Sequence, residues 1–271
     1  MNDRMIRPTN LPDFENPPLH EVVVGVQFAP IKGYSQINIG DVWALYKDDY
    51  PLTEAHSPLA PKLANYGLQV RQNEVQFIDG AIHDRFWFLT RSEGELIQFQ
   101  PDKFLHNWRK TDLGNNEYPR YEAISKKFET ELLQLELYFK RKFKATGLNI
   151  NHYEVSYVNT IYEKDLEGLN LNDIFSFVKF SQFPDNFATR FNRVLKNKTE
   201  QPYARLSIEV NQGVGPGGPL YKLSISVEGA PEDSSIKSAM GFIEEGRSLI
   251  VKTFKDVTGE KAHKVWRLKN E

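Results

Sequence analysis

The chain has 271 residues, of which 40% are hydrophobic and 26% are charged, and its formal net charge is -2. This is the composition of a globular protein with one large domain or two small ones, and the near-zero charge argues against a strongly basic nucleic-acid binder. The absence of cysteine excludes disulfides, thiolate metal sites and cysteine nucleophiles, and it fits a reducing cytoplasm. No apolar run reaches the roughly 20 residues that a membrane-spanning helix needs, so we expect a cytoplasmic protein with no membrane partner.

The N-terminal part of the chain predicts an extended arm followed by a central strand. Residues 1–18 contain four prolines and no apolar core, so they do not resemble a signal peptide and are expected to lie on the surface. The segment from His20 to Phe28 is rich in β-branched residues and nearly continuously apolar, which is typical of a buried strand. A short helix is predicted over residues 39–50, ended by Pro51, and a loop over residues 51–68.

Antiparallel strands and a long helix are predicted next. The strands are expected at residues 68–78, 85–90, 95–100 and 104–109, with a tight turn at Ser92-Glu93-Gly94. Apolar side chains then recur every three or four residues from Pro119 to Lys144, which predicts one long amphipathic helix that ends before Gly147.

The rest of the chain repeats this order of elements. It predicts strands at residues 153–161, 187–197, 204–210 and 221–228, a short helix at 169–180 and a final helix at 232–258 that ends at Gly259. Residues 211–219 are expected to form the hairpin loop between the last two strands.

The two halves match in sequence as well as in order. The segment Ile37–Trp43 (INIGDVW) resembles Leu169–Phe175 (LNLNDIF), and His20-Glu21-Val22 resembles Tyr153-Glu154-Val155. We therefore predict an α+β fold made by tandem duplication of a β-α-β(3–4)-α unit, with halves 19–148 and 149–271 forming one compact body. The two half-sheets are expected either to stack or to join edge to edge. Joining would give a saddle like that of the TATA-binding protein.

Five short blocks also resemble a known family. They are PPLHEVV (residues 17–23), LIQFQ (96–100), NWRK (107–110), YPRY (118–121) and EVSYVN (154–159). Together they resemble a sporadically distributed bacterial family with no assigned function, over about residues 15–162. The resemblance implies a bacterial cytoplasmic protein and supplies no reaction, cofactor or substrate. A sporadic distribution is typical of genes in defence or toxin-neutralising systems.

The first candidate site is the block His106-Asn107-Trp108-Arg109-Lys110. Its tryptophan and arginine could stack on a base or hold a carboxylate or phosphate. The alternative is a structural strand whose Trp108 packs under the long helix and whose Arg109 pairs with an acid such as Glu117 or Glu122.

The second candidate is the start of the long helix, with Arg120 and Tyr121. Backbone N–H groups at a helix start favour anions, and Arg120 would strengthen such a site. The alternative is a helix start that is simply packed by tyrosines.

The third candidate is a pair of carboxylates, Glu21 and Glu154, at equivalent points of the two halves. If the halves meet at a pseudo-two-fold axis, the two side chains would lie close enough for acid–base catalysis or for a metal. The alternative is two separate structural ion pairs.

Motifs for cofactors and metals are not found in the sequence. The histidines lack ligand spacing, and His83-Asp84 is the nearest approach to a metal pair. The glycine-rich segment 213–219 lacks the lysine and the following helix of a phosphate-binding loop. We expect neither a metal nor a cofactor.

The function predicted from these observations is non-enzymatic binding of a protein partner or of a second copy, through an open sheet face or the 104–122 block. The 13% aromatic content suits such an interface. One alternative is a nucleic-acid binder that uses Trp108, Arg109, Arg120, Arg190 and Arg193. The other is an enzyme that uses Glu21 and Glu154.

Overall fold

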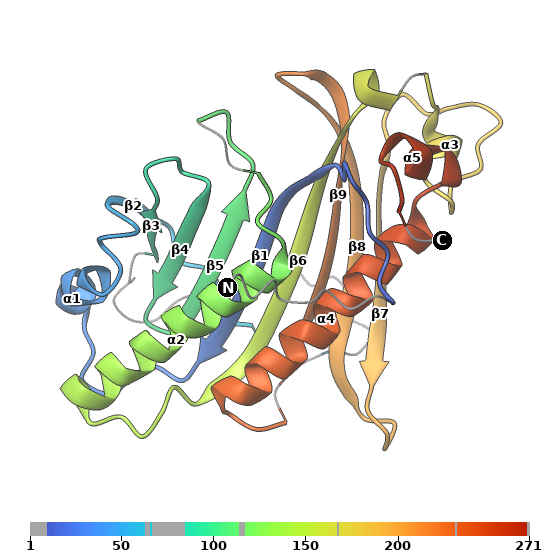
Figure 1. The fold of residues 1–271 in the computed structure, drawn as a ribbon. Coiled ribbons are helices and arrows are strands. Elements are labelled where there is room, and N and C mark those ends of the chain that lie inside the picture. Colours follow the sequence, from blue (N-terminus) through green and yellow to red (C-terminus); the bar gives the residue numbers. More distant parts are fainter. Residues whose placement is uncertain are drawn as a thin grey trace.

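The computed structural model describes residues 10–62, 66, 85–113, 117–166, 168–230 and 232–269. Its strands are β1 (Leu19–Phe28), β2 (Leu52–His56), β3 (Arg85–Leu89), β4 (Glu95–Gln100), β5 (Lys103–Arg109), β6 (Ile150–Tyr162), β7 (Ala188–Lys196), β8 (Pro202–Gly215) and β9 (Gly218–Gly229). They form one antiparallel sheet in the order β2-β3-β4-β5-β1-β6-β9-β8-β7 (Figure 1). The fold is therefore α+β, and the two halves of the chain meet edge to edge between β1 and β6.

Two long helices lie on one face of this sheet. Helix α2 (Tyr121–Phe143) crosses the first half of the sheet and α4 (Ile236–Val257) crosses the second half, as Figure 1 shows. The remaining helical elements are short: η1 (Gln36–Asn38), α1 (Ile39–Ala44), η2 (Glu163–Leu166), α3 (Leu171–Ile174) and α5 (Glu260–Val265). No helix in the described ranges is both long and apolar enough to cross a membrane.

The core lies between the sheet and the two long helices. On β1 every second residue, Val22, Val24 and Val26, is buried and faces the helices. On α2 the apolar positions recur at helical spacing, so Ile124 and Phe128 lie on the buried side. The apolar face of the strands, which repeats every two residues, thus packs against the apolar face of the helices, which repeats every 3.6 residues. Burial of this apolar layer drives folding.

Two glycines allow close packing in and just after α4: Gly246 against β6, and Gly259 against α3. A Cβ atom at Gly246 would lie 2.6 Å from Cγ1 of Val155, so glycine lets α4 sit directly on β6. The final predicted helix ends at Val257. Gly259 is then the N-cap of the separate helix α5, which the sequence did not predict. A Cβ atom at Gly259 would overlap the carbonyl oxygen of Asp173, so this glycine holds α3 against the end of α4.

Some predicted loops are strands. Residues 52–56, predicted as loop, form β2 and pair with β3 from Leu52/Leu89 to His56/Arg85. The sequence did not predict β2 because the side chains of this edge strand are mostly exposed and show no alternation of apolar and polar residues. The predicted loop 211–219 is also wrong, since β8 and β9 stay paired up to Gly215 and Gly218.

The predicted helix over residues 169–180 is a single four-residue turn, α3. Asn170 caps it by accepting hydrogen bonds from the backbone N–H groups of Asn172 and Asp173. The strand predicted at 68–78 and the pair His83-Asp84 lie outside the described residues.

Candidate functional site

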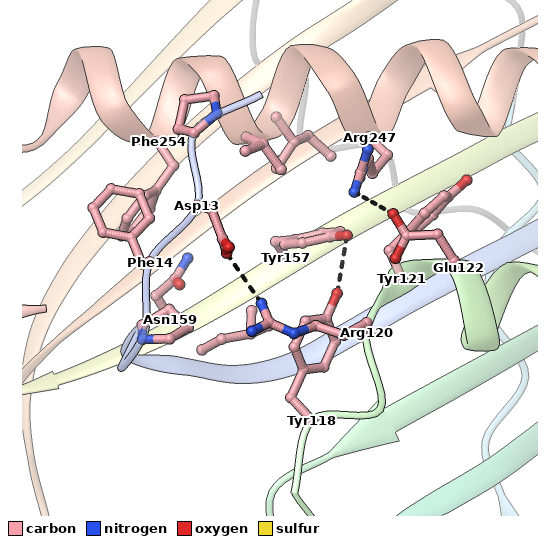
Figure 2. A pocket seen from close by; sticks show the side chains of 15 residues that line it. Asp13, Phe14, Tyr118, Arg120, Tyr121, Glu122, Tyr157, Asn159, Arg247 and Phe254 are labelled. Carbon is pink, nitrogen blue, oxygen red and sulfur yellow. Dashed lines mark hydrogen bonds and ion pairs between the residues drawn. The ribbon is translucent and has the colours of Figure 1, made fainter. Parts of the chain in front are cut away.

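A pocket of about 70 Å³ opens between the start of α2, the second half of α4 and the N-terminal arm (Figure 2). Its apolar wall consists of Pro12, Phe14, Pro17, Leu19, Ile250, Val251 and Phe254. Its polar groups come from Asp13, Tyr118, Arg120, Tyr121, Glu122, Tyr157, Asn159 and Arg247. A mainly apolar wall with a small number of placed polar groups is typical of small-molecule sites.

The N-terminal arm closes one side of the pocket. Phe14 forms a bridge with Leu268, and the backbone N–H of Glu15 donates to the carbonyl of Arg267 at 3.0 Å. The ring of Phe14 meets that of Phe254 edge to face, with centroids 5.2 Å apart. The arm is thereby fixed to the C-terminal end of the chain, and Phe14 becomes part of the pocket wall.

Arg120 enters the pocket from a strained backbone. It precedes α2 with φ of 74° and ψ of 153°, a conformation that residues with a Cβ atom rarely adopt. Its Nη1 donates to Oδ1 of Asp13 on the arm at 3.2 Å. Such strain costs about 1–3 kcal/mol and clusters at ligand clamps, so this helix start is a candidate functional site.

Arg247 is the most buried charged group of the pocket, with only 2% of its surface exposed. Its Nη2 donates to Oε1 of Glu122 at 2.9 Å, and its guanidinium carbon lies 4.8 Å from the ring centroid of Tyr121. Its Nε has no hydrogen-bond acceptor among the described residues, and its Nη1 lies 3.6 Å from Oε1 of Glu244, beyond a good hydrogen bond. The guanidinium of this pocket-lining residue therefore has donor capacity that no described acceptor takes up.

Tyr118 and Tyr157 contribute neutral polar groups to the lining. The hydroxyls of Tyr118 and Tyr157 lie 3.4 Å apart. Burial raises the pKa of Tyr118 to about 12 and the pKa of Tyr157 well above its usual value, so both hydroxyls are neutral near pH 7. They can donate and accept hydrogen bonds, but at this pH they cannot act as anionic bases.

The predicted residues of the 104–122 block are divided between the two faces of the sheet. Trp108 faces the helices, is buried as one alternative expected, and lies 5.0 Å from the Tyr118 ring behind the pocket. Arg109 points to the opposite face, where its Nε donates to the backbone carbonyl of Glu93 at 2.8 Å. Arg109 forms an ion pair with Glu93, so it pairs with an acid as one alternative expected, although with a different acid from the two named as examples.

Asn107 belongs to a row of polar side chains on the face away from the helices. Its Nδ2 donates to Oε1 of Glu21 at 2.7 Å, and its Oδ1 accepts from Gln98 at 2.9 Å. Gln98 in turn accepts from Arg85 at 2.7 Å. The row crosses four neighbouring strands and explains why Glu21 and Asn107 are polar inside the sheet.

His106 lies in the core rather than in the pocket. Its side chain is fully buried, and its Nδ1 is 2.8 Å from Oε2 of Glu131 on α2. The hydroxyl of Tyr50 donates to Oε1 of the same carboxylate at 2.5 Å. These three groups join β5, α2 and the segment after α1 through a buried polar contact.

The expected pair of Glu21 and Glu154 is not formed. Along β1, Glu21 lies opposite Val158, whereas Glu154 lies opposite Gly25, four residues further on. That offset is about 13 Å at the usual strand rise, too far for shared acid–base chemistry. The register between β1 and β6 thus separates the two carboxylates, although both strands are central.

The five residues proposed for nucleic-acid binding do not share a surface. Arg190 lies opposite Glu209 and Arg193 opposite Leu206, so the two arginines point to opposite faces of β7. Trp108 is buried and Arg120 lies at the pocket. Within the described ranges, no group of three or more His, Asp or Glu side chains is arranged to hold a metal ion.

The structure adds several site residues that the sequence prediction did not include, above all Arg247. The predicted apolar stripe of the last helix contains Ile243 and Ile250, and Arg247 occupies the helical position between them. A cation on the buried stripe of a helix is the signal that could have identified it. Phe14, Tyr157 and Phe254 show no comparable signal, because aromatic side chains in arms, strands and helices usually serve the core.

Comparison with protein-family models, with curated proteins and with solved structures gives no match for this chain. Its function is therefore inferred from the geometry of the pocket and of the surface.

Proposed function

We propose that this chain is a non-enzymatic binding protein whose pocket holds a mainly apolar molecule with one carbonyl or carboxylate oxygen. The observation that carries the proposal is the buried guanidinium of Arg247, whose Nε has no acceptor among the described residues. An unsatisfied buried donor costs about 1–3 kcal/mol, which a ligand oxygen would recover. The apolar walls would supply the remaining affinity through burial of the ligand body.

The charges around the pocket limit the ligand to one polar group. Arg247 is paired with Glu122 and Arg120 with Asp13, so two cations are balanced by two carboxylates. A multiply charged ligand would have to displace both carboxylates, whereas a single oxygen can accept from the free Nε–H without breaking either pair. The arrangement thus favours an amphipathic molecule over a nucleotide or a sugar phosphate.

Three matched probes test this chemistry: 2-naphthoate, 2-naphthamide and 2-methylnaphthalene, with dissociation constants measured by ligand-observed NMR. We expect both oxygen-bearing probes to bind about tenfold more tightly than the hydrocarbon, because one good hydrogen bond to a charged donor is worth about 1.5–3 kcal/mol. In Arg247→Met this preference should disappear, while Lys252→Met, an exposed cation on the same helix, should retain it.

A second variant separates loss of the site from loss of the fold. Val251→Trp would fill the pocket from its α4 wall and should abolish binding of all three probes. If the probes bind Val251→Trp and wild type equally, they bind elsewhere and the pocket is not the site. If Arg247→Met keeps the oxygen preference, the proposed role of the guanidinium is wrong.

A protein partner is a second candidate, and a surface observation supports it. Phe177, Phe180, Phe183 and Phe191 are all more than one-third exposed near the outer strand β7. Exposed aromatic side chains are enriched at protein interfaces. The family resemblance would place such a partner in the cytoplasm of a bacterium, as a component of a defence or toxin-neutralising system.

The strand order also supports the proposed duplication. Outward from the central pair β1 and β6, the neighbours are β5 and β9, then β4 and β8, then β3 and β7. Each set comes from equivalent positions of the two halves, and α2 and α4 follow the last strand of each half. We therefore propose that a β-α-β(3–4)-α unit was duplicated to give a saddle of the TATA-binding-protein type.

A further inference from the structure

Exposed phenylalanines lie on the outer strand β7 and in the segment that connects α3 to it. Phe177, Phe180 and Phe191 are 37%, 39% and 44% exposed, and Phe183 in the same connecting segment is 51% exposed. Phe177 and Phe191 meet edge to face with centroids 5.1 Å apart, so the aromatic surface continues from the segment after α3 onto the strand. We name Phe177, Phe180, Phe183 and Phe191 the phenylalanine patch.

The backbone of β7 is open on its outer side. β7 is the last strand in the sheet order, pairs only with β8 among the described strands, and runs for nine residues. Such an edge presents unpaired N–H and C=O groups that can take a further strand. The opposite edge strand, β2, has five residues and no comparable aromatic group.

The charges on β7 are all positive. The strand sequence ATRFNRVLK contains Arg190, Arg193 and Lys196 and no acidic residue. Lys196 is paired with Glu200, and Arg190 lies opposite Glu209 on β8. Neither Arg190 nor Arg193 has an ion-pair partner within the described part of the chain.

These charges decide which kind of strand fits. A second copy of β7 would place three cations beside three cations, and like charges on adjacent strands are destabilising. A strand rich in Asp and Glu would instead neutralise the arginines. Cations on an edge strand also discourage pairing with neutral or basic strands. The strand that would fit this edge is therefore an acidic one.

We propose that β7 binds an extended acidic segment of a protein partner as an additional strand of the sheet. Phe191 lies opposite Ile208 on the helix side, and Arg190 lies opposite Glu209 on the other side. The bound segment would therefore place apolar side chains on Phe191 and carboxylates near Arg190 at alternate positions. Arg193, on the same side as Phe191, would receive a further carboxylate at the end of the apolar row.

The test uses the full chain and a phage-displayed library of random dodecapeptides. We expect selection on the wild-type protein to enrich peptides in which Asp or Glu alternates with Phe, Leu, Ile or Val. A selected peptide should lose at least about tenfold in affinity for the double variant Arg190→Glu with Arg193→Glu. It should keep its affinity for Lys140→Glu with Arg141→Glu, which reverses two exposed cations at the far end of α2.

Backbone pairing is tested separately by N-methylation of the selected peptide. Only every second backbone N–H of an added strand points at β7. N-methylation of the residues whose N–H groups point at β7 should therefore abolish binding, whereas N-methylation of the residues between them should be tolerated. Equal tolerance at all positions would overturn strand addition. Enrichment of basic peptides, or unchanged affinity for the Arg190/Arg193 variant, would overturn the acidic partner.

Two measurements distinguish this surface from other sites. Val251→Trp, which fills the pocket, should leave peptide affinity unchanged, and a loss there would place the peptide in the pocket instead. Sedimentation of the wild-type chain should show no self-association through β7. A dimer that the Arg190/Arg193 variant strengthens would identify a second copy as the occupant and overturn the proposal.

Discussion

Glu154 on β6 lies directly opposite Glu228 on β9, and the two carboxylates experience opposite electrostatic environments. Nζ of Lys62 donates to Oε2 of Glu228 at 2.8 Å, and Arg205 lies on the other side of the same carboxylate at 3.5 Å. Burial raises the pKa of Glu154, and the nearby Lys62 only partly offsets this effect. Burial alone would raise the pKa of Glu228 as well, but Lys62, His152 and Arg205 together lower it.

Neutralising these two glutamates should change stability in opposite directions. The raised pKa of Glu154 means that its stabilising contribution is present below the unfolded value of 4.5 and is lost as pH rises through the folded value. At about pH 7.5 we therefore expect Glu154→Gln to have a larger free energy of unfolding than wild type, with a difference that shrinks towards pH 5. Urea unfolding at several pH values measures this difference.

Glu228→Gln should show the reverse pattern. Its lowered pKa gives stability that is present above 4.5 and is lost as pH falls through the folded value. Because the variant leaves Lys62 without its partner carboxylate, we expect a loss of about 1–3 kcal/mol near neutral pH. If both variants change the free energy of unfolding in the same direction at about pH 7.5, the pKa values of the two carboxyl groups are not shifted in opposite directions.

The strained backbone of Arg120 gives a second prediction. We expect Arg120→Gly to be more stable than Arg120→Ala by about 1–2 kcal/mol, because glycine adopts φ of 74° without a Cβ clash. Both variants lose the same ion pair with Asp13, so their difference isolates the backbone strain. Thermal and urea unfolding of the two variants measure it, and equal stabilities would show that the helix start carries no strain.

Much of the fold could be predicted from residue periodicity. The alternation of Leu96, Gln98 and Gln100 with Ile97 and Phe99 correctly placed β4 and its two faces. The three- and four-residue spacing of apolar side chains correctly identified α2. The edge strand β2 was not predictable in this way, since an exposed strand beside Pro58 and Pro61 has the composition of a loop.

The candidate site was predictable only in part. Arg120 and Tyr121 were identified because a helix start with an arginine suggests an anion site, and both line the pocket. The sequence could not show that Phe14, more than 100 residues away along the chain, would close the same pocket. The register that separates Glu21 from Glu154 was likewise not encoded in any local pattern.

The pair of Glu122 and Arg247 gives a third prediction. Nη2 of Arg247 donates to Oε1 of Glu122 at 2.9 Å, and this contact joins the two long helices. In a double-mutant cycle with Glu122→Gln and Arg247→Met we expect a coupling free energy of about 1–3 kcal/mol, because one partner is deeply buried. Urea unfolding of the four proteins measures it, and strict additivity would show that the contact adds no stability.

Two glycines of α4 give a matched test of how closely this helix lies on the sheet. A Cβ atom at Gly246 would lie 2.6 Å from Cγ1 of Val155, whereas one at Gly241 would meet no atom within 4 Å. We expect Gly246→Ala to lower the free energy of unfolding by about 1–2 kcal/mol, since overpacking outweighs the better helix propensity of alanine. Gly241→Ala should raise it by about 0.5–1 kcal/mol through propensity alone. Thermal unfolding should therefore shift in opposite directions for the two variants, and an equal rise in both would mean that α4 lies further from β6 than its contacts indicate.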